Sequence, residues 1–261
     1  MAAVRAPTPA RVPADLAAPR PDLGVLHRAP KITRVTWADW IRTLEVEPSL
    51  YAADFSRLGE QVDTLLRAEA RVFHFDVGDG HFIPPITMGP IVLQSIAPLV
   101  HDAGGVLDCH LMVLAPERQL EQFKEAGADS VTVHFEVCPD LRNVVLRARE
   151  LELQIGMALN PETSVDAAAA AAIAANVDLV LCMSVHPGYS GQAFIEGSTE
   201  RVHRLRELLP ESIRLQVDGG IDWENIAELR DSGATLFVAA TAIFGREDLP
   251  RAYRRLVQAL S

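Results

Sequence analysis

Short apolar runs recur along most of the chain, and longer segments with helix-like patterns separate them. The runs are rich in Val, Ile, Leu and Phe, as the buried strands of a parallel sheet are. Eight of them follow one another at 46–50, 71–77, 106–113, 130–136, 154–160, 179–185, 213–219 and 235–241. The segments between the runs are long enough for helices, for example 115–128, 161–177 and 222–234. This alternation predicts repeated strand–helix units.

Such units connect in a right-handed sense and build a parallel sheet. Eight units are the number found in a (β/α)8 barrel, and no run is followed by the GxGxxG turn of an open dinucleotide-binding sheet. Gly127 and Gly233 end two helical segments, where a left-handed glycine suits a helix stop. We therefore expect an α/β protein in which residues 45–261 form one (β/α)8 TIM barrel, the catalytic domain.

The N-terminal extension has a different composition. Residues 1–30 are rich in Pro, Ala and Arg and lack the continuous apolar stretch of a signal peptide, so we expect a flexible tail. The stretch "TWADWIRTL" follows, and Thr36 with Asp39 forms a plausible capping box. A short N-terminal helix is therefore predicted within 31–44.

Charge and composition narrow the class of partner. The formal net charge is −11, which argues against nucleic acid or an anionic membrane as the main partner. No apolar run has the length of a membrane-spanning helix, and three cysteines without framework spacing fit a reducing compartment. These observations predict a cytoplasmic protein.

The run at 71–77 carries two polar residues that an apolar strand would not need. Side chains alternate across a strand, so His74 and Asp76 share one face, about 6–7 Å apart, while Phe73, Phe75 and Val77 take the other. A carboxylate that faces a core is costly unless it is paired or binds a metal. This pair therefore indicates a site.

Other strand ends carry residues of the same kind. His110 lies near the end of the third run and Asp218 near the end of the seventh, and the carboxyl ends of barrel strands meet at one mouth. Together with His74 and Asp76 they offer two imidazoles and two carboxylates, which suit a divalent metal ion such as Zn, Fe(II), Mn or Co. A lone inward histidine is commonly an ordinary core residue, but four such residues on three strands favour a metal site.

Glycine-rich turns follow the later strands. They are "HPGYSGQ" (186–192) and "DGG" (218–220), and Ala240-Thr241 ends the eighth run. Barrels bind phosphate at this corner through backbone N–H groups, although turns also need glycine for conformation alone. The two lysines, Lys31 and Lys124, lie in the extension and on a predicted outer helix. Schiff-base chemistry is therefore disfavoured, and acid–base chemistry assisted by a metal is favoured.

From about Glu47 onward the chain resembles the ribulose-phosphate 3-epimerase family. The resemblance rests on "PSLYAADF", "HFDVGDGHF", "DCHLMV", "EAGADSVTVHFE", "MSVHPGYSGQAF", "QVDGGI" and "VAATAIF". It implies a metal-dependent isomerase that inverts C3 of a ketose 5-phosphate and interconverts D-ribulose 5-phosphate and D-xylulose 5-phosphate, in the pentose phosphate pathway. It also implies a homo-oligomer.

The resemblance implies roles for individual residues. Asp76 and Asp218 match the two residues that move the C3 proton through an ene-diolate, and with His74 and His110 they match the metal ligands. The residues implied to bind substrate are Ser49, His110, Met112, Met183, Gly188, Gly191, Gly219, Gly220, Ala240 and Thr241. His134 and Glu136 lie in a matching stretch, but we assign them no role.

The chain departs from the family pattern at Gly78, Pro85, Ser190 and Ala240. Gly78 stands where a methionine is usual, so a roomier pocket or a freer loop is expected there. Two alternatives therefore stay open: a 3-epimerase of another ketose phosphate, such as a hexulose 6-phosphate (allulose-6-phosphate-like), and a phosphosugar-binding barrel without turnover.

Overall fold

The computed structural model of the protein describes residues 44–261, and a sheet of eight parallel strands forms its centre. The strands are β1 (Glu45–Pro48), β2 (Val72–Gly78), β3 (Val106–Met112), β4 (Ser130–His134), β5 (Gln154–Leu159), β6 (Leu179–Met183), β7 (Arg214–Asp218) and β8 (Leu236–Ala239). Their bounds agree with the predicted runs to within about two residues.

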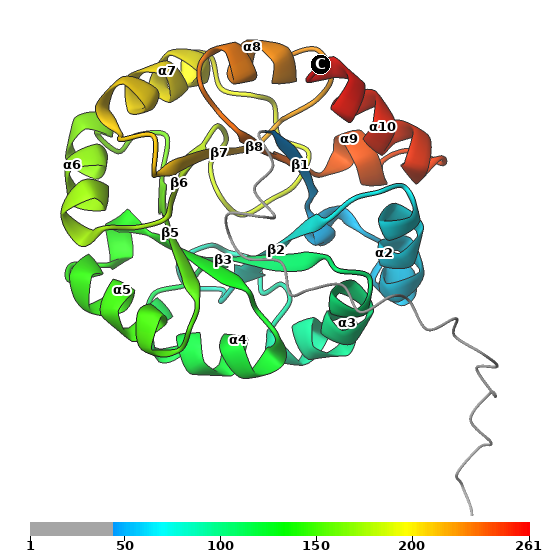
Figure 1. The fold of residues 1–261 in the computed structure, drawn as a ribbon, viewed down its shortest axis with the longest axis horizontal. Coiled ribbons are helices and arrows are strands. Elements are labelled where there is room, and N and C mark those ends of the chain that lie inside the picture. Colours follow the sequence, from blue (N-terminus) through cyan, green and yellow to red (C-terminus); the bar gives the residue numbers. More distant parts are fainter. Residues whose placement is uncertain (1–43) are drawn as a thin grey trace, which may run out of the picture. The chain divides into compact units, whose positions relative to one another are not determined.

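The sheet curls into a ring. Each strand pairs in parallel with its neighbour in the order β1-β8-β7-β6-β5-β4-β3-β2. An isolated parallel bridge between Ser49, directly after β1, and His74 within β2 joins the two strands at the ends of this order. Figure 1 shows the strands as a ring in the centre of the view, with helices around its outside. The predicted (β/α)8 barrel is confirmed.

Helices cover the outer face of the ring, as Figure 1 shows. They are α2 (Leu58–Arg67), α3 (Pro90–Asp102), α4 (Leu120–Ala126), α5 (Leu141–Glu150), α6 (Val165–Ala175), α7 (Ser198–Leu208), α8 (Ile226–Asp231), α9 (Thr241–Phe244) and α10 (Leu249–Ala259). Gly127 (φ 104°) and Gly233 (φ 103°) adopt the left-handed conformation expected at the ends of α4 and α8.

Strand alternation divides the apolar residues between two clusters. The larger lies between strands and helices and contains Phe73, Phe75 and Val77. The smaller lies inside the ring and contains Val72 and Leu181. The predicted outward direction of the first three residues is thus confirmed, and it leaves His74 and Asp76 facing inward.

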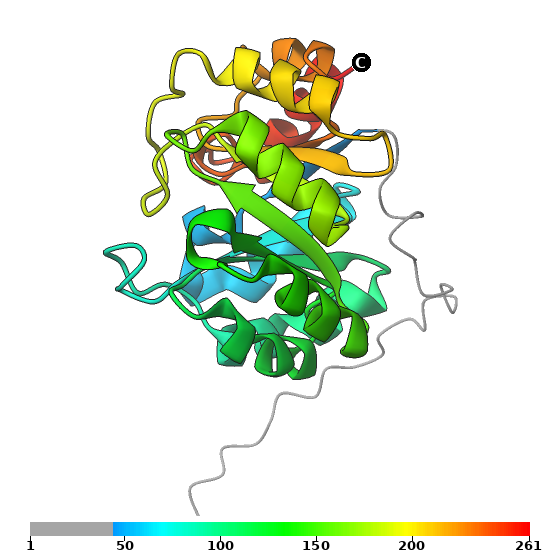
Figure 2. The ribbon, with the colours of Figure 1, turned by 90° about the vertical axis from the view of Figure 1, so that its left-hand side faces the viewer.

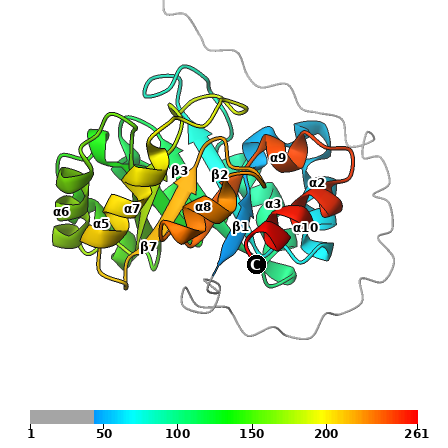
Figure 3. The same ribbon diagram turned by 90° about the horizontal axis from the view of Figure 1, so that it is seen from above.

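Two loops project from the end of the barrel where the strands finish. One follows β2 and the other follows β6, and Figures 2 and 3 both show them at the same end. They touch, because a Cβ atom built on Gly188 would lie 3.7 Å from the Cβ of Ile83. The Tyr51 hydroxyl donates a hydrogen bond of 3.3 Å to the Gly188 carbonyl. The β1 and β2 loops therefore support the β6 loop over the mouth.

The predicted tail at 1–30 and helix within 31–44 lie outside the described residues, apart from Leu44, and stay predictions. Among residues 44–261, none of the helices has both the length and the apolar character needed to cross a membrane.

Candidate active site

The four predicted metal ligands converge below the mouth of the barrel. His74 and Asp76 come from β2, His110 from β3 and Asp218 from β7. One donor atom from each lies within 4.8 Å of the corresponding atoms of the others. Both imidazoles are fully buried, Asp76 is buried, and the Asp218 side chain is 16% exposed. The structure thus brings together all four residues that the strand pattern selected.

The two imidazoles present different nitrogens to this cluster. His74 Nδ1 lies 3.1 Å from Asp108 Oδ2, so it donates its hydrogen there, and its Nε2 lies 3.3 Å from Asp76 Oδ1. His110 faces the same carboxylate through Nδ1, at 3.0 Å, while its Nε2 lies 2.8 Å from His134 Nε2. The neighbours of each ring therefore determine which nitrogen is free for a ligand.

The donor set fits a divalent transition metal. His74 Nε2 is buried and makes no hydrogen bond with any described group, although buried polar atoms are normally satisfied. Burial lowers the pKa of His110 to about 4, which keeps this imidazole neutral, as a metal ligand must be. Burial opposes a charge on His74, but Asp76, Asp108 and Glu47 outweigh it and raise the pKa of this imidazole, so a metal would displace the proton from its Nε2. Two imidazole nitrogens with two carboxylates suit Zn, Fe(II), Mn or Co.

The two aspartates have different proton affinities. Burial opposes the charge on Asp76, but His74 and His110 outweigh it and hold the pKa of Asp76 well below its usual range. Burial, followed by the charge of Asp76, raises the pKa of Asp218 to about 7. The protein groups by themselves therefore hold one carboxylate charged more firmly than the other, and a bound cation would favour both charges.

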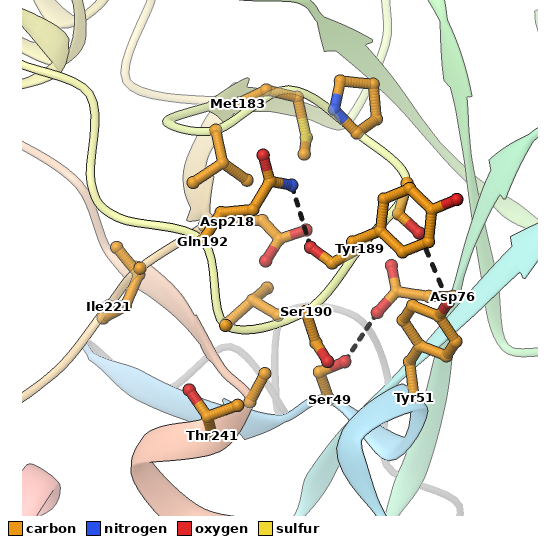
Figure 4. A pocket seen from close by; sticks show the side chains of 18 of the residues that line it. Ser49, Tyr51, Asp76, Met183, Tyr189, Ser190, Gln192, Asp218, Ile221 and Thr241 are labelled. Atoms are coloured by element: carbon orange, nitrogen blue, oxygen red, sulfur yellow. Dashed lines mark hydrogen bonds between the residues drawn. The ribbon is translucent and has the colours of Figure 1, made fainter. Parts of the chain in front are cut away.

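A pocket adjoins this cluster, and Figure 4 shows Asp76 and Asp218 among the side chains that line it. Nine of the ten residues implied to bind substrate line it: Ser49, Met112, Met183, Gly188, Gly191, Gly219, Gly220, Ala240 and Thr241. The tenth, His110, is fully buried and contacts Asp76, which lines the pocket. Ser49 Oγ donates a hydrogen bond of 2.6 Å to Asp76 Oδ2, which orients that carboxylate at the pocket floor.

The pocket wall contains no lysine or arginine from the described residues. Lys124 lies on α4 and donates to the Glu152 carbonyl, and Lys31 lies outside the described residues. An anionic group in this pocket would therefore be bound by backbone N–H and hydroxyl groups, since no basic side chain of residues 44–261 reaches it.

Gly219 and Gly220 are required by the shape of the turn after β7. Their φ angles are +119° and +64°. A Cβ on Gly219 would lie 2.5 Å from Val185 Cγ2, and one on Gly220 would lie 2.7 Å from the Phe194 nitrogen. Because no side chain fits, the backbone itself forms the pocket wall here.

The expectation of a roomier pocket at Gly78 is wrong. A Cβ on Gly78 would lie 2.5 Å from Ile83 Cδ1 and 2.8 Å from the Pro85 carbonyl oxygen. The loop after β2 thus fills the space that a larger side chain would take, and Gly78 does not line the pocket. The loop is also held, because Thr87 Oγ1 donates to the Asp76 carbonyl and accepts from the Gly78 N–H.

A second layer of polar residues lies deeper in the barrel, two residues earlier along the strands. Gln216 Nε2 donates to Glu47 Oε2 at 2.6 Å and to Asp108 Oδ2 at 2.9 Å. Glu47 Oε2 also lies 3.7 Å from His74 Nδ1. None of these three residues is among those predicted from the sequence. Strand alternation could have found them, because each precedes an expected site residue by two positions.

His134 and Glu136 extend the site sideways. His134 Nδ1 lies 3.2 Å from Glu136 Oε2, and the other oxygen of this carboxylate accepts from the Asn160 N–H and the Thr163 hydroxyl. Phe82 packs against His134 with ring centroids 4.6 Å apart. If His110 offers the Nδ1 lone pair to a metal, its Nε2–H donates to His134, and His134 Nδ1–H donates to Glu136. One proton arrangement then satisfies the whole row.

The fold and this site define a class: a (β/α)8 barrel with a polar donor cluster at the carboxyl ends of its strands, below a pocket walled by glycine turns. The model of the ribulose-phosphate 3 epimerase family matches residues 45–244. The chain belongs to the ribulose-phosphate 3-epimerase family.

Curated relatives agree with this assignment. The ribulose-phosphate 3-epimerase of Bacillus subtilis is 35% identical over 213 residues, which cover 80% of this chain and 96% of the relative. That of Aquifex aeolicus is 39% identical over 212 residues, covering 80% and 93%. The expected identity as an isomerase of this family is confirmed.

Solved structures with little sequence identity share the fold. A 3-hexulose-6-phosphate synthase superposes with a TM-score of 0.66 at 18% identity, covering 84% of this chain and 100% of that one. The thiamine phosphate pyrophosphorylase from Pyrococcus furiosus superposes with a TM-score of 0.62 at 17% identity, covering 85% and 97%. At these identities the likeness concerns the barrel alone.

Proposed function

We propose that the protein is a metal-dependent epimerase that inverts C3 of a ketose phosphate and interconverts D-ribulose 5-phosphate and D-xylulose 5-phosphate. The observation that carries this proposal is the pair Asp76 and Asp218, on two separate strands of one donor cluster at the floor of a pocket. Family membership supplies the substrate class. The filled space at Gly78 removes the feature that favoured a larger hexulose 6-phosphate.

Inversion at C3 requires a base on one face of the carbon and an acid on the other. One aspartate removes the C3 proton, the electrons of that bond move into a C2–C3 double bond, and the C2 carbonyl becomes part of an ene-diolate. The other aspartate returns a proton to the opposite face, and the carbonyl re-forms. No electrons leave the substrate, and the carboxylates exchange roles in the reverse direction.

His74, Asp76, His110 and Asp218 would hold the divalent metal. When bound, the ion supplies Lewis-acid stabilisation of the negative charge that develops on the C2 and C3 oxygens. Ser49 holds Asp76 in place from the side of the pocket. The turns at Gly188, Gly191, Gly219 and Gly220, with the Thr241 hydroxyl, bind the phosphate.

The test is proton exchange in D2O. We expect purified protein to remove the C3–H NMR signal of D-ribulose 5-phosphate while xylulose 5-phosphate appears, and a chelator to abolish both changes until metal is restored. Asp76→Asn and Asp218→Asn should each lower kcat by about 10²–10⁴-fold, the usual contribution of a positioned acid or base.

Asp140→Asn is a matched control, because this aspartate caps α5 away from the pocket. It should keep full activity. A metal-loaded sample that exchanges no proton would reject this substrate, and hexulose 6-phosphates would then be tested in the same way. No exchange with either sugar would favour a barrel that binds phosphosugars without turnover.

A further inference from the structure

A group of arginines surrounds a tryptophan on the outer surface, away from the donor cluster. Trp223 lies in the loop between β7 and α8, Arg246 follows α9, and Arg251 and Arg255 lie on α10. Together with Asp248 and Ala252 they line one surface pocket. We call Trp223, Arg246, Arg251 and Arg255 the arginine–tryptophan cluster. Figure 1 shows α9 and α10 side by side at the end of the chain, with α8 nearby.

Within residues 44–261, the guanidinium groups of this cluster have no carboxylate partner. No ion pair joins Arg246, Arg251 or Arg255 to a carboxylate of residues 44–261. Elsewhere on the helices arginines pair with nearby carboxylates, as Arg57 does with Glu60 and Arg204 with Glu207. Asp248, which also lines the pocket, accepts the Arg251 backbone N–H as the cap of α10.

Trp223 holds two of these cations in place. The guanidinium carbon of Arg255 lies 3.7 Å from the ring centroid, and that of Arg246 lies 4.9 Å from it. A guanidinium stacked on a ring keeps the N–H groups at its edge free, so stacking orients the donors without using them. The tryptophan is half-buried and packs against the main core, which fixes the platform.

The gathering of three positive charges is unfavourable unless something compensates it. The whole chain carries a net charge of −11, so this is no general basic surface. The protein alone bears the mutual repulsion of three cations, and a bound anion would relieve it. Planar arginine forks match the oxygens of phosphate better than those of a monovalent halide.

We infer that the arginine–tryptophan cluster is a second anion site, for the phosphate group of a small phosphorylated molecule. It is distinct from the pocket above the donor cluster, although the same loops carry both. Ile221 lines that pocket two residues before Trp223, and Thr241 lines it at the start of α9, shortly before Arg246. The site does not depend on the proposed epimerase activity.

The chain provides its own reporter for a test. Its three tryptophans are Trp37, Trp40 and Trp223, so the double variant Trp37→Phe/Trp40→Phe emits from Trp223 alone. In this full-length variant, inorganic phosphate should produce a saturable change of emission. Half-saturation is expected on the order of 1 mM, and sodium chloride of equal ionic strength should give no such change.

Arg251 makes the test decisive, because it lines the pocket, whereas the cation–π contacts with Trp223 come from Arg246 and Arg255. Arg251→Gln in the same background should weaken phosphate binding about tenfold while leaving the reporter intact, since one charge-assisted donor is lost. Arg142→Gln, an exposed arginine on α5, is the matched control and should bind as before.

The kcat/KM for D-ribulose 5-phosphate should be the same in all these variants. Equal phosphate affinity in Arg251→Gln and its parent would overturn the inference, because the signal would then come from another site. It would also be overturned if phosphate gave neither an emission change nor heat in calorimetry.

Discussion

At the scale of single residues, the site is a set of buried groups whose neighbours decide which atom each one offers. His110 is the clearest example, because its Nε2 faces His134, which in turn faces Glu136. A carboxylate behind a metal-binding histidine fixes the ring and raises its basicity. If His110 binds a metal, Glu136 acts on it through an intermediate imidazole and is a positioning residue.

We predict that Glu136→Gln weakens metal binding by about 10–100-fold, the range found when such outer partners are changed. The amide keeps the shape of the side chain but removes the charge that supports His134 and His110. The dissociation constant is measured by competition with a chromogenic chelator, without reference to turnover. Glu150→Gln, an exposed carboxylate on α5, should leave it unchanged. Equal metal affinity in the wild type and Glu136→Gln would show that the contacts from Glu136 through His134 to His110 do not support metal binding.

Strand alternation and apolar spacing suffice to predict His74, Asp76, His110 and Asp218 as one cluster. They do not suffice for Glu136. The predicted run continued to residue 136, whereas β4 ends at His134 and Phe135–Val137 is a 3-10 turn. Alternation no longer applies there, and the turn folds the carboxylate back onto His134. Contacts made across turns depend on backbone angles that a pattern of residue types does not contain.

At the scale of elements, the barrel depends on close packing where helices end and the next strands begin. Gly127 ends α4 with a φ of +104°, and a Cβ there would lie 2.6 Å from the Cβ of Ala97 on α3. The sequence indicates the left-handed turn, since glycine before a strand is a typical helix stop. The close approach of α3 depends on packing between segments that are distant in sequence.

We predict that Gly127→Ala lowers the free energy of unfolding by about 1–3 kcal/mol, because it adds left-handed strain to a steric overlap. Gly59→Ala is a matched control on α2, where nothing lies within 4 Å of the added Cβ. That change should stabilise the protein by about 0.5–1 kcal/mol, as alanine is favoured inside a helix. Urea unfolding followed by circular dichroism measures both. A Gly127→Ala variant as stable as the wild type would contradict the packing shown here.

At the scale of the whole molecule, the interior of the barrel contains both apolar residues and a layer of buried polar residues. Apolar residues such as Val72 and Leu181 fill part of it, while Glu47, Asp108 and Gln216 form a buried polar layer below the donor cluster. Such a layer costs stability unless its charges are compensated. The layer thus links the stability of the whole barrel to pH. The assembly of whole barrels into a homo-oligomer stays a prediction from family resemblance.

The two carboxylates of this layer divide their charge unequally. Burial opposes ionisation of Asp108, but hydrogen bonds and charge from His74, with Gln216 and Ser130, lower the pKa of Asp108. Glu47 has fewer donors, and one of its oxygens accepts no hydrogen bond from any described group. Burial therefore raises the pKa of Glu47 from 4.5 to about 7.

We predict that Glu47→Gln stabilises the protein at pH 8 and has little effect at pH 5. The folded state binds a proton at Glu47 more tightly than the unfolded chain does, so this contribution to stability is complete below pH 4.5 and is lost as the pH rises through 7. The loss amounts to about 3 kcal/mol above that range, and a neutral amide avoids it. Urea unfolding of chelator-treated protein at the two pH values measures the difference, with Glu125→Gln on the exposed side of α4 as the control. If Glu47→Gln changed stability equally at pH 5 and pH 8, Glu47 would be charged throughout, and the polar layer would hold two charged carboxylates instead of one.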